Sequence, residues 1–218
     1  MTSQQEVLDT LAKVARALGN GHRLALLERL AQAEAPVETL ATAGELSVGN
    51  ASQHLQQLRR AGLVTAKRSG KQMIYRLADE RIVTLLSLLR QVAESNLAEM
   101  ERLVSQLFSD DDAAGALEAV TRDELMASLE RGTVALLDVR PEEEYKAGHL
   151  PQAINIPLDQ LEDMLDRLPR DREIVAYCRG PYCALSHEAV QQLSQLGYRI
   201  RRFEEGYPEW KAAGLPVA

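Results

Sequence analysis

The chain has few of the features that mark a secreted or membrane-embedded protein. Of its 218 residues only Cys178 and Cys183 are cysteines, which is too few for a secreted disulfide scaffold and more typical of a reactive thiol site. The apolar run 82–89 is too short to cross a bilayer. Residues 1–10 lack the basic and apolar segments of a signal peptide. We therefore expect a cytoplasmic protein, not bound to a membrane, with one or two ordinary cores.

Acidic residues are missing from one part of a chain that is acidic as a whole. The formal net charge is −7, but residues 1–108 carry 13 Lys and Arg against 11 Asp and Glu, whereas residues 109–218 carry 12 against 21. Residues 46–78 contain six basic residues and no acidic one. That stretch is a candidate surface for phosphate groups.

Helical periodicity dominates the first half of the chain. Apolar residues recur at helical spacing in five segments, at 4–18, 24–33, 36–42, 48–61 and 79–108. Ser47 is a suitable N-cap for the fourth segment. Two short strands, 63–67 and 72–77, flank a basic hairpin at 68–71. Three helices, a capped fourth and a basic hairpin predict a winged helix-turn-helix, mostly α-helical with a β wing.

The segment 48–61 would enter the major groove of DNA. Its outward face carries side chains that can pair with base edges, namely Asn50, Ser52, Gln53, His54, Gln56 and Gln57. Attraction to phosphate would come from the basic residues that follow, namely Arg59, Arg60, Lys67, Arg68 and Lys71. Each feature alone is usually ordinary solvated surface. Their order along the chain favours a DNA-binding domain.

Three segments of this half carry a family pattern, ALGNGHRL at 17–24, LSVGNASQHL at 46–55 and AGLV at 61–64. Through them residues 5–105 resemble the ArsR-type family of bacterial winged-helix repressors. The resemblance implies a homodimer, formed through the first and last helices, that represses by occupying a promoter. Many members sense metals through cysteines in the third helix or through Asp, His and Glu in the last one. Because 36–42 has no cysteine and 79–108 has no histidine, we expect neither a metal nor another cofactor.

The acidic, small-residue-rich stretch 109–115 is the best domain boundary in the chain. We place the domains at 1–108 and 120–218, with a linker at 109–119. In the second domain Thr121 caps a helix to about residue 131, and helical periodicity returns at 184–196. Strands are expected at 134–139, 174–177 and 198–203. Strands alternating with helices predict an α/β domain with a mainly parallel sheet and a site at the C-terminal strand ends.

Cys178 follows one of these strands and precedes a short loop and a helix. The loop consists of Arg179, Gly180, Pro181 and Tyr182. Such a loop directs backbone N–H groups and the positive end of a helix at the sulfur, which stabilises a thiolate or a persulfide anion. Pro181 has no N–H, so the ring of donors is incomplete. Cys178 is therefore the candidate reactive group.

A second family pattern runs through LDVR at 137–140, YKAGHLP at 145–151, AINIP at 153–157, YCR at 177–179 and GYPEW at 206–210. Through these segments residues 120–218 resemble the single-domain rhodanese family. The resemblance implies that Cys178 accepts sulfane sulfur from a donor such as thiosulfate and passes it to a thiol acceptor. Arg179 would assist in the loop, and Asp138 and Arg140 would support it. Asp138 would support the loop by accepting hydrogen bonds from backbone N–H groups beneath it.

The chain departs from that family at Cys183, where many rhodaneses close the loop with an arginine. The missing guanidinium argues against efficient use of thiosulfate, although Arg179 could supply part of the charge. Related phosphatases need an arginine where Ala184 stands, which disfavours phosphoryl transfer. Cys183 is either a resolving thiol that attacks a Cys178 persulfide or a plain loop residue, with a metal ligand as the third choice.

Together these patterns favour a DNA-binding transcriptional repressor whose rhodanese domain carries sulfane sulfur on Cys178, for sensing or processing reactive sulfur. Its expected partners are promoter DNA, a second copy of the chain, a small sulfur donor (thiosulfate, polysulfide or a persulfide) and a thiol acceptor. One alternative is a sulfurtransferase enzyme whose N-terminal half only dimerises or localises it. Another is a thiol redox sensor that uses a Cys178–Cys183 disulfide. The sequence leaves all three open.

Overall fold

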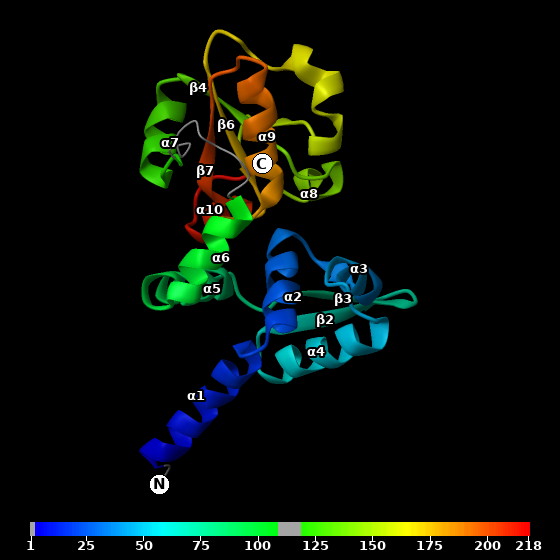
Figure 1. The fold of residues 1–218 in the computed structure, drawn as a ribbon. Coiled ribbons are helices and arrows are strands. Elements are labelled where there is room, and N and C mark those ends of the chain that lie inside the picture. The colour runs from blue at the N-terminus through cyan, green and yellow to red at the C-terminus, as the bar shows by residue number, and fades with distance from the viewer. Residues whose placement is uncertain (1–2, 109–118) are drawn as a thin grey trace. The chain divides into compact units, whose positions relative to one another are not determined.

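The computed structural model describes residues 3–108 and 119–218 (Figure 1). The chain divides into two compact units, Met1–Leu86 and Ser87–Ala218. The linker expected at 109–119 lies, except for residue 119, outside the described residues. The domain boundary from the sequence therefore stays a prediction.

Four helices precede the hairpin of the first unit, and all but α3 begin with a side-chain cap. They are α1 (Gln4–Leu18), α2 (Gly21–Gln32), α3 (Val37–Ala43) and α4 (Val48–Arg60). The hydroxyl of Ser47 accepts the backbone N–H of Asn50 at 3.2 Å. The side chain of Asn20 accepts the N–H of Arg23 at 3.2 Å in the same way at the start of α2. These contacts satisfy N–H groups that a helix leaves unpaired, and the four predicted helices are confirmed.

A three-stranded antiparallel sheet completes the first unit. Its strands are β1 (Ala35–Pro36), β2 (Val64–Ser69) and β3 (Gln72–Leu77), in the order β1-β3-β2. The β2–β3 register runs from Val64 opposite Leu77 to Ser69 opposite Gln72. Gly70 turns the hairpin with a φ of +60°, which glycine adopts without steric cost. The predicted wing is thus a regular hairpin.

The prediction of a single long helix over 79–108 is wrong, because the helix is interrupted at Leu97. The two parts are α5 (Arg81–Asn96) and α6 (Ala98–Phe108). The Asn96 side chain donates to the carbonyl of Val92 at 2.8 Å, and side-chain bonds of this kind compete with the backbone ladder of a helix. No helix among residues 3–108 and 119–218 is both long and apolar enough to cross a bilayer.

The second unit is built on a four-stranded parallel sheet. Its strands are β4 (Val134–Asp138), β5 (Ile154–Asn155), β6 (Glu173–Cys178) and β7 (Ile200–Gly206), in the order β5-β4-β6-β7. Its helices after α6 are α7 (Arg122–Glu130), α8 (Glu142–Lys146), α9 (Ala184–Gln195) and α10 (Tyr207–Ala212), with two 3-10 turns at Leu158–Gln160 and Glu162–Arg167. All strand pairs in this sheet are parallel. The predicted α/β domain is confirmed.

Successive residues of β6 point to opposite faces of this sheet. Ala176 and Cys178 join the buried cluster formed with α9, whereas Val175 and Tyr177 join the cluster that contains Trp210 of α10. Figure 1 shows α7 and α9 on either side of the strands. Cys178 therefore ends its strand on the α9 face, at the C-terminal edge of the sheet.

Candidate functional site

The two cysteines lie at the ends of the loop between β6 and α9, which we call the sulfur loop (residues 178–183). Cys178 is 1% exposed, whereas Cys183 is the partly exposed N-cap residue of α9. Their sulfur atoms form a disulfide, with 6.3 Å between the Cα atoms. The backbone N–H of Cys183 also donates to the carbonyl of Gly180 at 3.2 Å. The structure thus brings the two predicted thiols into direct contact.

The sulfur loop rests on the end of β7. A Cβ atom on Gly206 would lie 2.6 Å from the carbonyl carbon of Arg179 and 2.7 Å from the carbonyl oxygen of Cys178, so the two backbones approach too closely for any other residue. Arg202 of the same strand donates from Nη1 to the carbonyl of Pro181 at 3.1 Å. Burial lowers the pKa of this guanidinium. β7 thus holds the loop at two points.

Arg179, the predicted loop cation, is engaged by Glu144 of α8. Its Nε donates to both carboxylate oxygens, at 3.1 and 3.0 Å, and its Nη2 donates at 2.8 Å. Glu144 is almost fully buried. Many rhodaneses have an arginine at the position of Cys183. Arg179 is poorly placed to substitute for that arginine, because its Nε and Nη2 already donate to a carboxylate.

Asp138 and Arg140 form a fully buried ion pair. Arg140 donates to the Asp138 carboxylate from Nη2 at 2.6 Å, from Nε at 3.0 Å and from its backbone N–H at 3.0 Å. Burial and the nearby carboxylate raise the pKa of Tyr177 above its usual range, so its hydroxyl stays protonated and donates to Asp138. The donors that reach Asp138 in the described residues are these, not the loop N–H groups suggested by the sequence. A buried carboxylate needs a compensating cation.

Two side chains of α5 reach the sulfur loop from outside the predicted rhodanese domain. Nη2 of Arg90 lies 3.3 Å from Oε1 of the buried Glu209, and its guanidinium lies 5.6 Å from the centre of the Tyr182 ring. The Tyr182 hydroxyl donates to the carboxylate of Glu94. All four residues belong to the second unit. Sequence reasoning missed this cluster, because an Arg and a Glu four apart on a helix are usually an ordinary solvated pair.

Replacing Arg90 by methionine should raise the pKa of Glu209. Burial already raises this pKa, while the charge of Arg90 and the N–H of Gly206, which donates at 3.1 Å, oppose the rise. Methionine keeps an unbranched side chain but removes the compensating cation. Nuclear magnetic resonance titration of the Glu209 carboxyl carbon measures the change, with Arg102→Met on α6 as the control. An unchanged pKa would mean that Arg90 does not face Glu209 in solution.

α4 presents most of the predicted base-reading side chains to solvent. Those exposed or partly exposed are Asn50, Ser52, Gln53 and Gln56. Gln57 is also exposed, but it accepts a hydrogen bond from Nη1 of Arg23 at 2.7 Å. The central part of the predicted reading face is therefore accessible to a duplex.

His54 occupies the side of α4 that faces α2. Its ring centre lies 5.7 Å from that of His22 of α2. The Nδ1 atom of His54 is buried and meets no hydrogen-bond partner among the described residues. Burial lowers the pKa of His54, and the charges of Arg23 and His22 lower it further. The ring is thus held neutral beside α2.

The predicted phosphate-binding residues are all exposed, on the last turn of α4 and on the wing: Arg59, Arg60, Lys67, Arg68 and Lys71. Nζ of Lys67 lies 2.9 Å from Oε1 of Glu34, and Nε of Arg68 donates to the carbonyl of Gly70 at 3.1 Å. An exposed ion pair such as Lys67–Glu34 is weak and screened by salt. A phosphate group can therefore replace Glu34 as the partner of Lys67.

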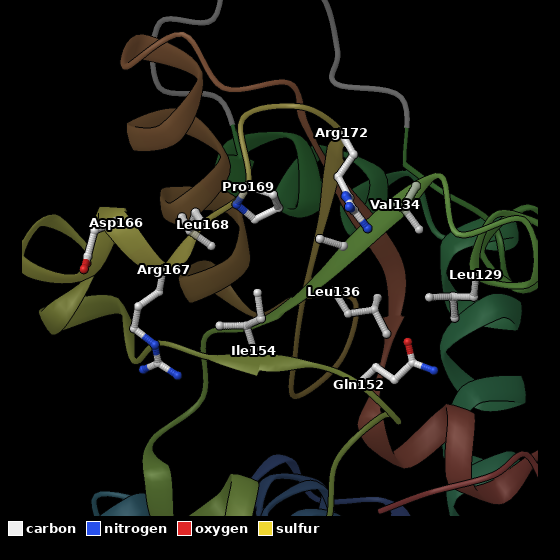
Figure 2. A pocket seen from close by; sticks show the side chains of 11 residues that line it. Leu129, Val134, Leu136, Gln152, Ile154, Asp166, Arg167, Leu168, Pro169 and Arg172 are labelled. Atoms are coloured by element: carbon white, nitrogen blue, oxygen red, sulfur yellow. The ribbon is translucent and has the colours of Figure 1, made fainter.

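A hollow in the second unit lies apart from the sulfur loop. Residues 3–108 and 119–218 hold no group of three or more His, Cys, Asp or Glu placed to bind a metal ion. A hollow of about 390 Å³ opens at the β5 edge of the sheet, and Figure 2 shows Leu136, Ile154 and Arg167 around it. None of its lining residues belongs to the sulfur loop. The hollow is separate from the thiol chemistry.

Known proteins match each unit and also the chain as a whole. A model described as a rhodanese-like domain matches residues 121–213, and one described as a helix-turn-helix domain matches residues 18–65. An HTH-type transcriptional regulator of Mycobacterium tuberculosis is 44% identical over 211 residues, which cover 97% of this chain and 91% of that protein. A sulfurtransferase of Allochromatium vinosum is 34% identical over 38% of this chain and 78% of its own length.

A solved structure is also similar to the first half of the chain. The homodimeric winged helix-turn-helix DNA-binding domain of a possible ArsR-family regulator from Mycobacterium bovis is 41% identical, with a TM-score of 0.41. The match covers 45% of this chain and 95% of that one. The relative from M. tuberculosis carries the assignment, because its similarity extends over nearly the full length of both proteins. The chain belongs to the HTH-type transcriptional regulators, with an ArsR-type helix-turn-helix domain followed by a rhodanese-like domain.

Proposed function

We propose that this chain is a promoter-binding repressor whose DNA affinity changes when sulfur chemistry occurs at Cys178. The observation that carries the proposal is the pairing of Cys178 and Cys183 across one loop, in a chain that also presents an exposed α4 face and a basic wing. A resolving thiol at this distance converts a sulfur donor into a defined covalent change of the protein. A promoter-binding protein of this kind would act in the cytoplasm, where it can reach the DNA.

The proposed thiol chemistry has two steps. The Cys178 thiolate attacks the terminal sulfur of a persulfide donor, R–S–SH, which gives Cys178–S–SH and releases R–S⁻. The Cys183 thiolate then attacks the sulfur of Cys178, which forms the disulfide and releases HS⁻. The first step alone is sulfur transfer. Both steps together convert the two thiols into a disulfide, which remains after the donor has left.

A thiol would reset this disulfide. An incoming thiolate meets Cys183 first, because Cys178 is 1% exposed while Cys183 is partly exposed. Attack at Cys183 forms a mixed disulfide there and releases Cys178 as a thiolate. A second thiolate then attacks the outer sulfur of this mixed disulfide, which frees Cys183 as a thiolate and releases the two incoming thiols as the disulfide R–S–S–R. The same loop thus accommodates loading, resolution and reduction.

We propose that the repressor acts as a homodimer through the apolar faces of its first and last N-terminal helices. Val7 and Leu11 of α1 are 60% and 65% exposed, and Val92 of α5 is 61% exposed. A second copy would remove these side chains from water. Burial of apolar surface stabilises a dimer by about 25 cal/mol per Å². Two-fold symmetry then predicts two DNA half-sites about one helical turn apart.

Replacing both Lys67 and Lys71 by alanine should weaken binding to every duplex. Each lysine that contacts a phosphate adds about 0.9 to the slope of log affinity against log salt, so the double variant should show a flatter salt dependence by up to twice that amount. Fluorescence anisotropy with the chain's own promoter and an unrelated duplex measures both. Lys146→Ala, which removes a charge from α8, serves as the control. Equal salt slopes would exclude the wing from phosphate contact.

Replacing Gln53 by alanine should have a different effect. A side chain that reads a base edge contributes about 1–3 kcal/mol of discrimination, so affinity for the promoter should fall while affinity for the unrelated duplex stays unchanged. Glu38→Ala on α3, an exposed side chain outside α4, is the control. Equal losses of affinity for both duplexes would indicate that Gln53 contacts the sugar-phosphate backbone of DNA and not a base.

The sensing part is tested by operator binding before and after treatment with polysulfide. Wild type should change its affinity, by a factor typical of allosteric coupling, about 5- to 150-fold, and dithiothreitol should restore the starting value. Cys178→Ser should not respond. A response to hydrogen peroxide but not to polysulfide would favour the direct redox sensor, which the disulfide also suits. Identical affinity in all states, together with turnover of a sulfur donor, would favour the enzyme that is only tethered to DNA.

A further inference from the structure

The sulfur loop is held not only by the rhodanese sheet but also by α5. Tyr182 directly precedes Cys183, and its hydroxyl donates to Glu94. The guanidinium of Arg90, one helical turn earlier, lies 5.6 Å from the centre of the same ring. The residue next to the resolving thiol is therefore in contact with two charged side chains of one helix.

A second contact links α5 to the other side of the loop. Arg90 also pairs with Glu209 at 3.3 Å, with only 15% and 9% of the two side chains exposed. The carboxylate oxygens of Glu209 lie 3.6 and 3.8 Å from the position of a Cβ on Gly180. Arg90 thus touches the loop at Tyr182 directly and at Gly180 through Glu209. Because this pair is shielded from water, it is weakened little by salt.

The disulfide and these contacts involve the same short backbone. Four residues separate Cys178 from Cys183, and Cys178 is fixed at the end of β6. Formation or reduction of the disulfide must therefore be accommodated by residues 179–183, in which Tyr182 is adjacent to Cys183 in the sequence. The same contacts tie α5 to the loop, and α5 is the helix whose first turn contributes Ile82 to the core of the first unit.

We propose that α5 is part of the sulfur site. Arg90 and Glu94 are positioning residues that hold the sulfur loop in its disulfide form, so that the state of Cys178 and Cys183 and the placement of α5 depend on each other. The inference rests on the proposed function, since it names how the sulfur state would be transmitted. It predicts that residues outside the rhodanese domain set the stability of the disulfide.

The test measures the equilibrium between the Cys178–Cys183 disulfide and a series of glutathione buffers, on the intact chain. Tyr182→Phe removes the hydrogen bond to Glu94, and Glu94→Gln replaces its charged acceptor by a neutral one. Each should lower the equilibrium constant for the disulfide by about tenfold, which corresponds to about 30 mV. Arg90→Met should act in the same direction, and Arg90→Lys should recover part of the loss. Tyr198→Phe and Glu99→Gln make the same changes away from the loop and should leave the constant unchanged.

A second arm adds saturating promoter duplex to the same measurement. If the disulfide state changes DNA affinity, then DNA must change the disulfide constant by the same factor. In wild type this shift should match the measured change in DNA affinity, and in Tyr182→Phe it should be smaller. The duplex thus reports whether the loop and the DNA-binding part are linked through the contacts of α5.

The outcomes separate this inference from the proposed function. Constants for Tyr182→Phe and Glu94→Gln equal to wild type would overturn the role of α5, even where wild type responds to DNA, and the sensor would then need another route. Shifted constants with no effect of DNA in wild type would support α5 as part of the site but remove the sensing function. Shifted constants in both control variants as well would also overturn the inference, because the effect would then be a general loss of stability.

Discussion

Intact-protein mass spectrometry of Cys178→Ala is expected to show no sulfur added after incubation with polysulfide, whereas wild type gains sulfur transiently, before Cys183 forms the disulfide and releases HS⁻. Cys178 ends β6 beside the N-terminus of α9, a helix of 12 residues, and the positive end of such a helix stabilises a negatively charged sulfur. Cys178 is also buried, with 1% of its surface exposed, which should slow the attack of other thiols on a persulfide there. The loss should be complete rather than partial, since the variant has no nucleophile at this position.

Cys183→Ala is the matched control for this result. It should still load sulfur, and the persulfide should accumulate, because the thiol that would resolve it is absent. Sulfur on Cys183 in Cys178→Ala at the wild-type rate would reverse the two roles. That outcome deserves a direct measurement because Cys183 is the more exposed of the two sulfurs.

Arg140→Met should destabilise the second unit by about 3–5 kcal/mol. It leaves the carboxylate of Asp138 buried without its cation, and breaking a fully buried pair from one side costs about this much. The carbonyl of Gly148 also loses a donor that lies at 2.8 Å. The cost is large because both side chains are 0% exposed, so water cannot replace the lost partner.

Urea unfolding followed by tryptophan fluorescence measures this loss in the second unit alone. Trp210 is the single tryptophan of the chain, and it is buried against Phe203 of β7. Arg122→Met is the control, since its ion pair with Glu205 is partly exposed and should contribute at most about 1 kcal/mol. A similar midpoint for Arg140→Met and wild type would show that the buried pair contributes nothing net to stability.

The local features of the fold follow from short stretches of sequence. Ser47 and Thr121 were predicted as caps, and both accept the N–H three residues on. The predicted strands of the sheet and wing appear in the structure with shifted ends, and β5, which has two residues, was not predicted. A strand of this length has too few side chains for a period of two to be recognised.

The break at Leu97 shows where periodicity misleads. Apolar residues continue at helical spacing through 79–108, so the pattern predicts one helix. The spacing of apolar residues shows which side chains share a face of a helix. It does not show that a side chain such as Asn96 donates a hydrogen bond to a backbone carbonyl and competes with the helix ladder. The apolar spacing therefore continues across Leu97, although α5 ends at Asn96 and α6 begins at Ala98.

The sequence alone determined the two-domain architecture, the caps at Ser47 and Thr121 and the wing, and it singled out Cys178 and Cys183 as the candidate thiols. These depend on residues within one or two turns of each other, or on motifs that stay together along the chain. Only the tertiary structure decided that Asp138 pairs with Arg140, that Arg202 holds the carbonyl of Pro181, and that Arg90 meets Glu209. Arg90 and Glu209 are 119 positions apart, and no local rule relates them. Such a contact exists only once the tertiary structure places the guanidinium of the partly buried Arg90 beside the carboxylate of the buried Glu209, which needs a compensating cation.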